Sequence, residues 1–132
     1  GFEECSLRSI VTAMKAIQES GYPVYKIVHD TFHHHIGPDT FDTIENDYDI
    51  SYTGLVHISG VEYNIPVEEY RDNHRVLVTA QDRLQTKEQI ELLLKLGYVG
   101  NISFEPFSKT IQEMEIEKIK SAINHSIEYI SN

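Results

Sequence analysis

Two carboxylates and an imidazole, Asp30, His57 and Glu105, each stand at or just after a stretch rich in β-branched and aromatic residues. Such stretches predict β-strands, and neighbouring parallel strands lie about 5 Å apart. The three side chains then meet at one edge of a sheet. Oxygen ligands with one imidazole nitrogen suit Mn²⁺, Co²⁺, Zn²⁺ or Mg²⁺. Each residue alone is more typical of a turn or a solvated loop, but three equivalent positions predict a divalent-metal site.

A run of three histidines, His33–His35, lies in the connection that follows Asp30. In an extended segment, neighbouring side chains point to opposite sides, so at most two of the three histidines face one site. We favour His33, in the pattern Asp30-x-x-His33, as the histidine that faces the site. His34 and His35 are expected to be supporting or structural residues.

A second polar group, Asp72-x-His74-Arg75, lies in the long segment after His57. Aspartate and histidine two residues apart are a compact pair of metal-ligand types. The planar guanidinium of Arg75 suits an anionic or polyhydroxy substrate. We therefore expect His74 and Arg75 to bind substrate, and the alternative is a charged turn.

Helix-like and strand-like segments alternate along the chain, which predicts parallel β/α units and an α/β fold. Apolar residues at spacings of three and four, with capping and stop signals, predict the helices, and a short helix is also expected after Gly37-Pro38. The predicted helices are 6–20, 39–44, 86–96 and 109–130, and the predicted strands are 24–28, 55–58 and 98–104. In such folds, polar residues at the carboxyl ends of strands form the active site.

The composition is that of one globular domain: 132 residues, of which 40% are hydrophobic and 24% charged. Twenty-one acidic residues against eleven Lys and Arg give a net charge of -10, and no basic patch is concentrated anywhere. Such a chain repels nucleic acid and anionic membranes, so we expect neither as a partner.

The single cysteine, Cys5, has no partner for an internal disulfide, which favours a reducing compartment and a cytoplasmic protein. No apolar stretch approaches the ~20 residues that span a membrane. Cys5 has no neighbouring His or Asp pattern, so it is interpreted as a small buried residue.

The order of these motifs resembles the xylose isomerase-like TIM barrels, most closely the sugar isomerase/epimerase branch that includes inositol-catabolism proteins. The resemblance is carried by His29-Asp30-Thr31-Phe32-His33, Leu55-Val56-His57-Ile58, Asp72-x-His74-Arg75 and Ile102-Ser103-Phe104-Glu105-Pro106. It implies that residues 1–132 form a single partial barrel domain, the C-terminal half of a (β/α)₈ barrel from helix 5 to helix 8.

The resemblance also implies roles for these residues. Asp30, His57 and Glu105 match the metal ligands of strands six, seven and eight, and His33 and Arg75 match substrate-contacting positions. The chemistry would be proton transfer next to a carbonyl of a sugar or polyol through an enediolate, with Glu105 as one of two proton-transferring carboxylates. The second carboxylate, at the end of strand five, would precede Gly1, so we expect the chain alone to be inactive.

Two alternatives remain open. The first is an endonuclease-IV-type AP endonuclease, in which His33, Asp72 and His74 would hold a second metal ion beside the first. The second alternative is a catalytically silent partial barrel. In every case three strands cannot close an eight-stranded barrel, so we expect a homo-oligomer or association with the N-terminal half.

Overall fold

Three parallel strands form one sheet in the order β1-β2-β3 in the computed structural model, which describes residues 1–132. The strands are β1 (Ile27–Asp30), β2 (Thr53–Ile58) and β3 (Ile102–Phe104). The helices are α1 (Ile10–Ser20), α2 (Thr31–Ile36), α3 (Phe41–Asp47), α4 (Thr86–Lys95), α5 (Lys109–Gln112) and α6 (Ile116–Ser131). Short 3₁₀ segments lie at Ile50–Tyr52, Val67–Glu69 and Asp72–His74. This order confirms the predicted α/β fold of parallel units. None of the helices has the length and hydropathy of a membrane span.

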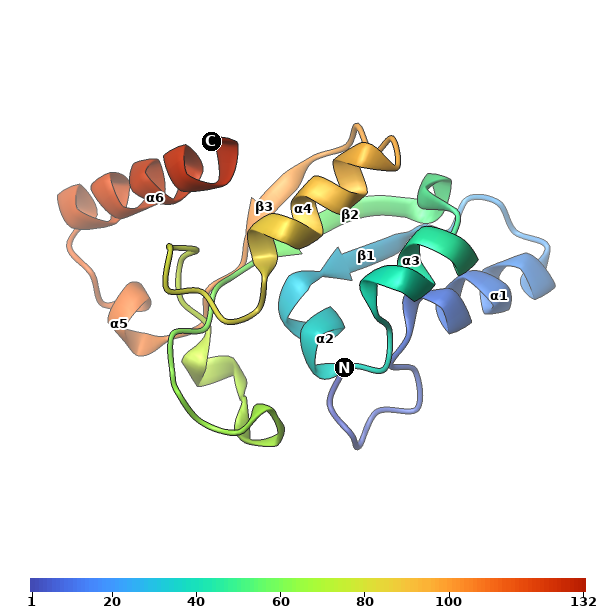
Figure 1. Cartoon of the computed structure of the whole chain (residues 1–132), viewed down its shortest axis with the longest axis horizontal. Helices are drawn as coiled ribbons and strands as arrows, with labels where there is room; N and C mark the ends of the chain where they lie inside the picture. The colour runs from blue at the N-terminus through green and yellow to red at the C-terminus, as the bar shows by residue number, and fades with distance from the viewer.

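The helices α1, α3 and α4 cover one face of the sheet (Figure 1). Residues of alternate strand positions, such as Val56 and Ile58, pack there against Met14 of α1, Ile44 of α3 and Leu93 of α4. Burial of this apolar surface is the main source of stability, at about 25 cal/mol per Å² removed from water. The core therefore fixes the strands relative to the helices α1, α3 and α4, and with them the positions of the strand ends.

The opposite face of the sheet carries the polar residues of interest. Val28 pairs with Leu55 and Asp30 pairs with His57, so these four side chains share that face. Val28 is 47% exposed, which is unusual because parallel sheets are normally covered on both faces. The exposed face supports the expectation of an oligomer or of a partner half-barrel, which stays a prediction.

The first helix begins later than the sequence indicated. Ser9, rather than Ser6, caps it: the Ser9 hydroxyl accepts a hydrogen bond from the backbone N–H of Thr12, and the Asp39 carboxylate accepts one from Ile10. At the other end Gly21 adopts a left-handed conformation, φ 72°, which ends the helix at residue 20 as predicted. Local caps therefore determined both ends, but Asp39 is a long-range contribution.

The prediction that His33–His35 form an extended segment is wrong, because these residues lie in the helix α2. The Asp30 carboxylate accepts a hydrogen bond from the backbone N–H of His33 (3.1 Å), so Asp30 is the N-cap of this helix. Successive residues of a helix point about 100° apart, so the three histidines face three directions instead of two. His33 and His34 line the same hollow as Asp30, and His35 does not.

The predicted helix 109–130 is broken into α5 and α6, although no glycine or proline marks the break. The start of α5 is held in place because Phe107 and Ser108 donate backbone hydrogen bonds to the Arg75 carbonyl (3.1 and 2.9 Å). The apolar residues that recur at helical spacing in this segment predict a buried stripe of Ile111, Met114, Ile119, Ala122, Ile123, Ile127 and Ile130. Most of that stripe is not buried. Of its members only Ile111 is buried, Ile127 is exposed, and the rest are half-buried. In Figure 1, α6 stands apart from the helices that cover the sheet, and only Tyr129 and Ile130 near its end pack against the main core.

Two adjacent leucines of α4 test this description of the core. Leu93 is 1% exposed and belongs to the main core, whereas Leu94 is 53% exposed. Leu93→Ala should lower the free energy of unfolding by about 2–5 kcal/mol, because it leaves a cavity. Leu94→Ala is the matched control and should change it by no more than about 0.5 kcal/mol. Urea unfolding measures both values, and equal losses would show that α4 does not pack as described.

Candidate metal centre

Asp30, His57 and Glu105 converge at the carboxyl ends of the three strands. Asp30 ends β1, His57 is the penultimate residue of β2, and Glu105 directly follows β3. The backbone N–H of Glu105 donates to the Ile58 carbonyl (2.8 Å), so strand pairing continues as far as Glu105. One ligand atom from each side chain lies within 4.8 Å of the other two. This proximity agrees with the expectation that the three side chains meet at one edge of the sheet, and metal binding itself stays a prediction.

These three side chains fit a divalent ion. Two ligands bonded to one ion at about 2.1 Å lie no more than about 4.2 Å apart, so the observed spacing needs only a small contraction. Nδ1 of His57 is already 3.2 Å from Oε2 of Glu105. All three residues are half-buried, which leaves a path for the ion and for a substrate. The donor set of two carboxylates and one imidazole is typical of Zn²⁺ and Mn²⁺ sites.

Arg75 lies directly against these carboxylates. Its Nη2 donates to Oδ2 of Asp30 (2.8 Å) and to Oε2 of Glu105 (2.9 Å), and its Nη1 donates to Asp72 (3.3 Å). The side chain is only 1% exposed. We expected this guanidinium to bind substrate, but it presents no exposed pair of N–H groups for that purpose.

The charge of Asp30 is stabilised by its surroundings. Burial by itself would raise the pKa of this carboxyl, but the Arg75 guanidinium and the backbone N–H of His33 outweigh burial, so the pKa lies below its ordinary value. Asp30 therefore remains an anion at neutral pH, which is the form that binds metal ions.

His33 lies beside the three candidate ligands. It lines an open hollow of about 520 Å³ together with Asp30, His57 and Glu105. Its imidazole packs nearly perpendicular to the rings of Phe2 and Phe32, whose centres lie 5.3 and 5.4 Å away. Burial lowers the pKa of His33, so the ring is neutral at pH 7 and can donate or accept a hydrogen bond. Its expected role as a substrate contact stays a prediction.

Asp72 and His74 do not join this group. The Asp72 carboxylate is half-exposed and bonds to Arg75. Nδ1 of His74 accepts a hydrogen bond from the backbone N–H of Arg71 (3.1 Å), and its ring packs against Tyr63. The one group of side chains with metal-ligand spacing is Asp30, His57 and Glu105. The candidate second metal site of His33, Asp72 and His74 is therefore not assembled here.

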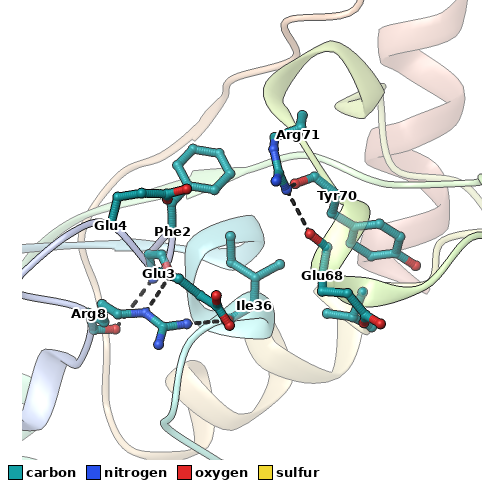
Figure 2. Close-up of a pocket in the computed structure, with 10 residues that line it drawn as sticks. Phe2, Glu3, Glu4, Arg8, Ile36, Glu68, Tyr70 and Arg71 are labelled. Carbon is teal, nitrogen blue, oxygen red and sulfur yellow. Dashed lines mark hydrogen bonds between the residues drawn. The ribbon is translucent and has the colours of Figure 1, made fainter.

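A smaller pocket of about 220 Å³ lies next to α2, between the N-terminal segment and residues 67–71 (Figure 2). Arg8 closes one side of it: Nε donates to the Gly1 carbonyl (2.9 Å) and Nη2 to the Ile36 carbonyl (3.0 Å). The backbone nitrogen of Gly1 donates to the carbonyl of His33 (2.9 Å). These bonds fasten the N-terminal segment to α2 and so help to position His33.

The sequence analysis did not identify the buried polar residues that form hydrogen bonds next to the candidate metal centre. Ser59 follows β2 and accepts a hydrogen bond from Nε of Arg75 (3.1 Å), while its carbonyl accepts one from the Thr86 hydroxyl (2.7 Å). On the covered face of the sheet, Nε2 of His29 lies 2.9 Å from Oε1 of Gln89. Polar residues inside predicted core segments were the available signal for this network.

Buried histidines make the fold sensitive to acid. Burial, with smaller contributions from the charges of His29 and His35, lowers the pKa of His34 from 6.5 to about 3. Between these values the unfolded chain binds a proton that the native chain does not bind, so stability falls as the pH falls below 6.5.

His34→Phe tests this pH dependence. Phenylalanine keeps the ring that stacks on Phe41 but cannot titrate. The variant should lose less stability than the wild type between pH 6.5 and 4.5, by up to about 1.4 kcal/mol per pH unit. Urea unfolding at several pH values gives the two slopes. Identical slopes would show that His34 is not held neutral in the native state.

Comparison with known proteins agrees with this geometry. A family model described as xylose isomerase-like TIM barrel matches residues 2–131. None of the curated proteins compared with the chain matches it. A xylose isomerase domain-containing protein from Salmonella typhimurium LT2 is 38% identical, with a TM-score of 0.95 over 100% of this chain and 48% of that protein.

A second solved structure is the IolI protein with a bound zinc atom. It is 18% identical, with a TM-score of 0.82 over 99% of this chain and 46% of that protein, and so shows likeness of fold. The chain thus spans about half the length of both structures. The predicted partial barrel is confirmed, and the chain belongs to the xylose isomerase-like TIM barrel family.

Proposed function

We propose that the protein containing this chain is a divalent-metal-dependent isomerase or epimerase of a sugar or polyol. The observation that carries the proposal is the convergence of Asp30, His57 and Glu105 within 4.8 Å, at the strand ends where barrels of this architecture place their active sites. The zinc atom bound by the IolI protein, which shares the fold, supports the proposal that this protein also binds a divalent ion.

Asp30, His57 and Glu105 would hold the ion. When bound, a divalent ion polarises a substrate carbonyl or hydroxyl oxygen as a Lewis acid. Asp30 contributes an anion that stays ionised at neutral pH, and His57 would contribute an imidazole nitrogen. Two carboxylates match the charge of a divalent ion, so the loaded site would be close to neutral apart from Arg75.

Glu105 would move the proton. Oε2 of Glu105 is engaged by Arg75 and lies beside His57, whereas Oε1 makes no hydrogen bond within the protein. The carboxylate lines the open hollow together with His33. It can therefore accept a proton from a carbon next to a carbonyl and return it, while His33 binds a substrate hydroxyl. In the two-carboxylate scheme of the family, Glu105 would be one of the two.

The endonuclease alternative receives less support from the structure. That reading needs a second metal site from His33, Asp72 and His74, which do not come together here. The net charge of -10 also disfavours a surface that follows a phosphate backbone. A sugar or polyol, which is uncharged or carries one phosphate, suits the small open hollow better.

Glu105→Gln tests the proposed role in proton transfer. In the complete gene product the variant should lose at least about 100-fold in turnover, because it removes a charged ligand and the proton-accepting oxygen together. Glu113→Gln, at the exposed end of α5, is the matched control and should keep full activity. Conversion of a panel of ketoses and their epimers measures both. Turnover of the Glu105 variant equal to that of the control would rule out this assignment.

A further inference from the structure

We propose that Arg75 is a positioning residue: it holds the carboxylates of Asp30 and Glu105 in the geometry that a divalent ion requires. This inference rests on the proposed function, since it concerns the same metal centre. It follows from the contacts of one side chain that joins two of the three candidate ligands through a single nitrogen atom.

The hydrogen bonds of Arg75 leave little for another molecule. A guanidinium has five N–H donors in a fixed plane. Nη2 uses two on Asp30 and Glu105, Nη1 uses one on Asp72, and Nε uses one on Ser59. A single N–H of Nη1 remains. Bidentate capture of a phosphate, carboxylate or diol needs two N–H groups, so Arg75 cannot supply it without releasing a carboxylate.

The surroundings of Arg75 hold the guanidinium in this position. Its central carbon lies 4.9 Å from the centre of the Phe32 ring and 4.9 Å from that of the Phe107 ring. Its own backbone carbonyl accepts hydrogen bonds from Phe107 and Ser108. The side chain is 1% exposed. Because its backbone and its guanidinium are both fixed and two aromatic rings cover it, Arg75 can restrain the carboxylates of Asp30 and Glu105.

The bonds from Arg75 leave room for a cation. Each carboxylate oxygen has two lone pairs, and Arg75 takes one on Oδ2 of Asp30 and one on Oε2 of Glu105. The other oxygen of Asp30 accepts the His33 N–H, which fixes the rotation of that carboxylate. The two carboxylates are thus oriented before an ion arrives, and their mutual repulsion is offset by the guanidinium charge.

Arg75→Lys separates charge from geometry. Lysine keeps the positive charge but is a flexible point charge without a planar fork, so it cannot hold both oxygens in one arrangement. Loss of such a supporting contact typically weakens metal binding by about 10- to 100-fold. Titration calorimetry with Mn²⁺ on the metal-stripped complete gene product should show a loss of this size. Arg83→Lys, an exposed arginine outside the site, should bind Mn²⁺ like the wild type.

The outcomes distinguish this inference from the proposed function. If the wild type binds no Mn²⁺ or Zn²⁺, the proposed metal centre fails. If the wild type binds and folded Arg75→Lys binds equally well or more tightly, the positioning role of Arg75 is overturned. Should Arg75→Lys not fold, Ser59→Ala replaces it, because that change removes only the bond to Nε. A several-fold weaker affinity of this variant supports the inference, and unchanged affinity overturns it.

Discussion

Backbone hydrogen bonds between three parallel strands determine where the chemistry of this chain can take place. Asp30 lies beside His57 in the register of β1 and β2, and the backbone of Glu105 is tied to Ile58 of β2. A shift of one residue in either pairing would turn the side chains of that strand to the opposite face. The apolar core between the sheet and α1, α3 and α4 prevents such a shift, because it would expose Val56 and Ile58. The candidate ligands thus owe their proximity to packing on the far side of the sheet.

A buried positive charge completes the centre. Removing a guanidinium from water costs several kcal/mol unless its hydrogen bonds are satisfied. Arg75 is satisfied by two carboxylates of the centre, by Asp72 and by Ser59. The same bonds restrain the carboxylates of Asp30 and Glu105. One set of contacts therefore both stabilises the buried Arg75 and orients the candidate metal ligands. Burial of Arg75 also explains why the segment Asp72–His74, although rich in polar groups, supports the centre from outside without supplying ligands.

Strand-end chemistry was predictable from sequence because it depends on local patterns: short β-branched stretches, each followed by a polar residue. The helical state of His33–His35 was not recognised, although an aspartate three residues before His33 is a helix-capping signal. The burial of Arg75 depends on partners 45 and 30 residues away and leaves no local pattern. The exposure of α6 was also hidden, since an amphipathic stripe indicates that a helix needs a partner surface but not whether this chain provides it.

Zinc-edge X-ray absorption on the metal-loaded complete gene product tests the central claim most directly, that Asp30, His57 and Glu105 bind one divalent ion. The account predicts a single bound zinc with imidazole and carboxylate ligands at about 2.0–2.2 Å, and loss of the imidazole signal in His57→Ala but not in His34→Phe. An imidazole signal that persists in His57→Ala, or that disappears in His34→Phe, would place the ion elsewhere and contradict the account.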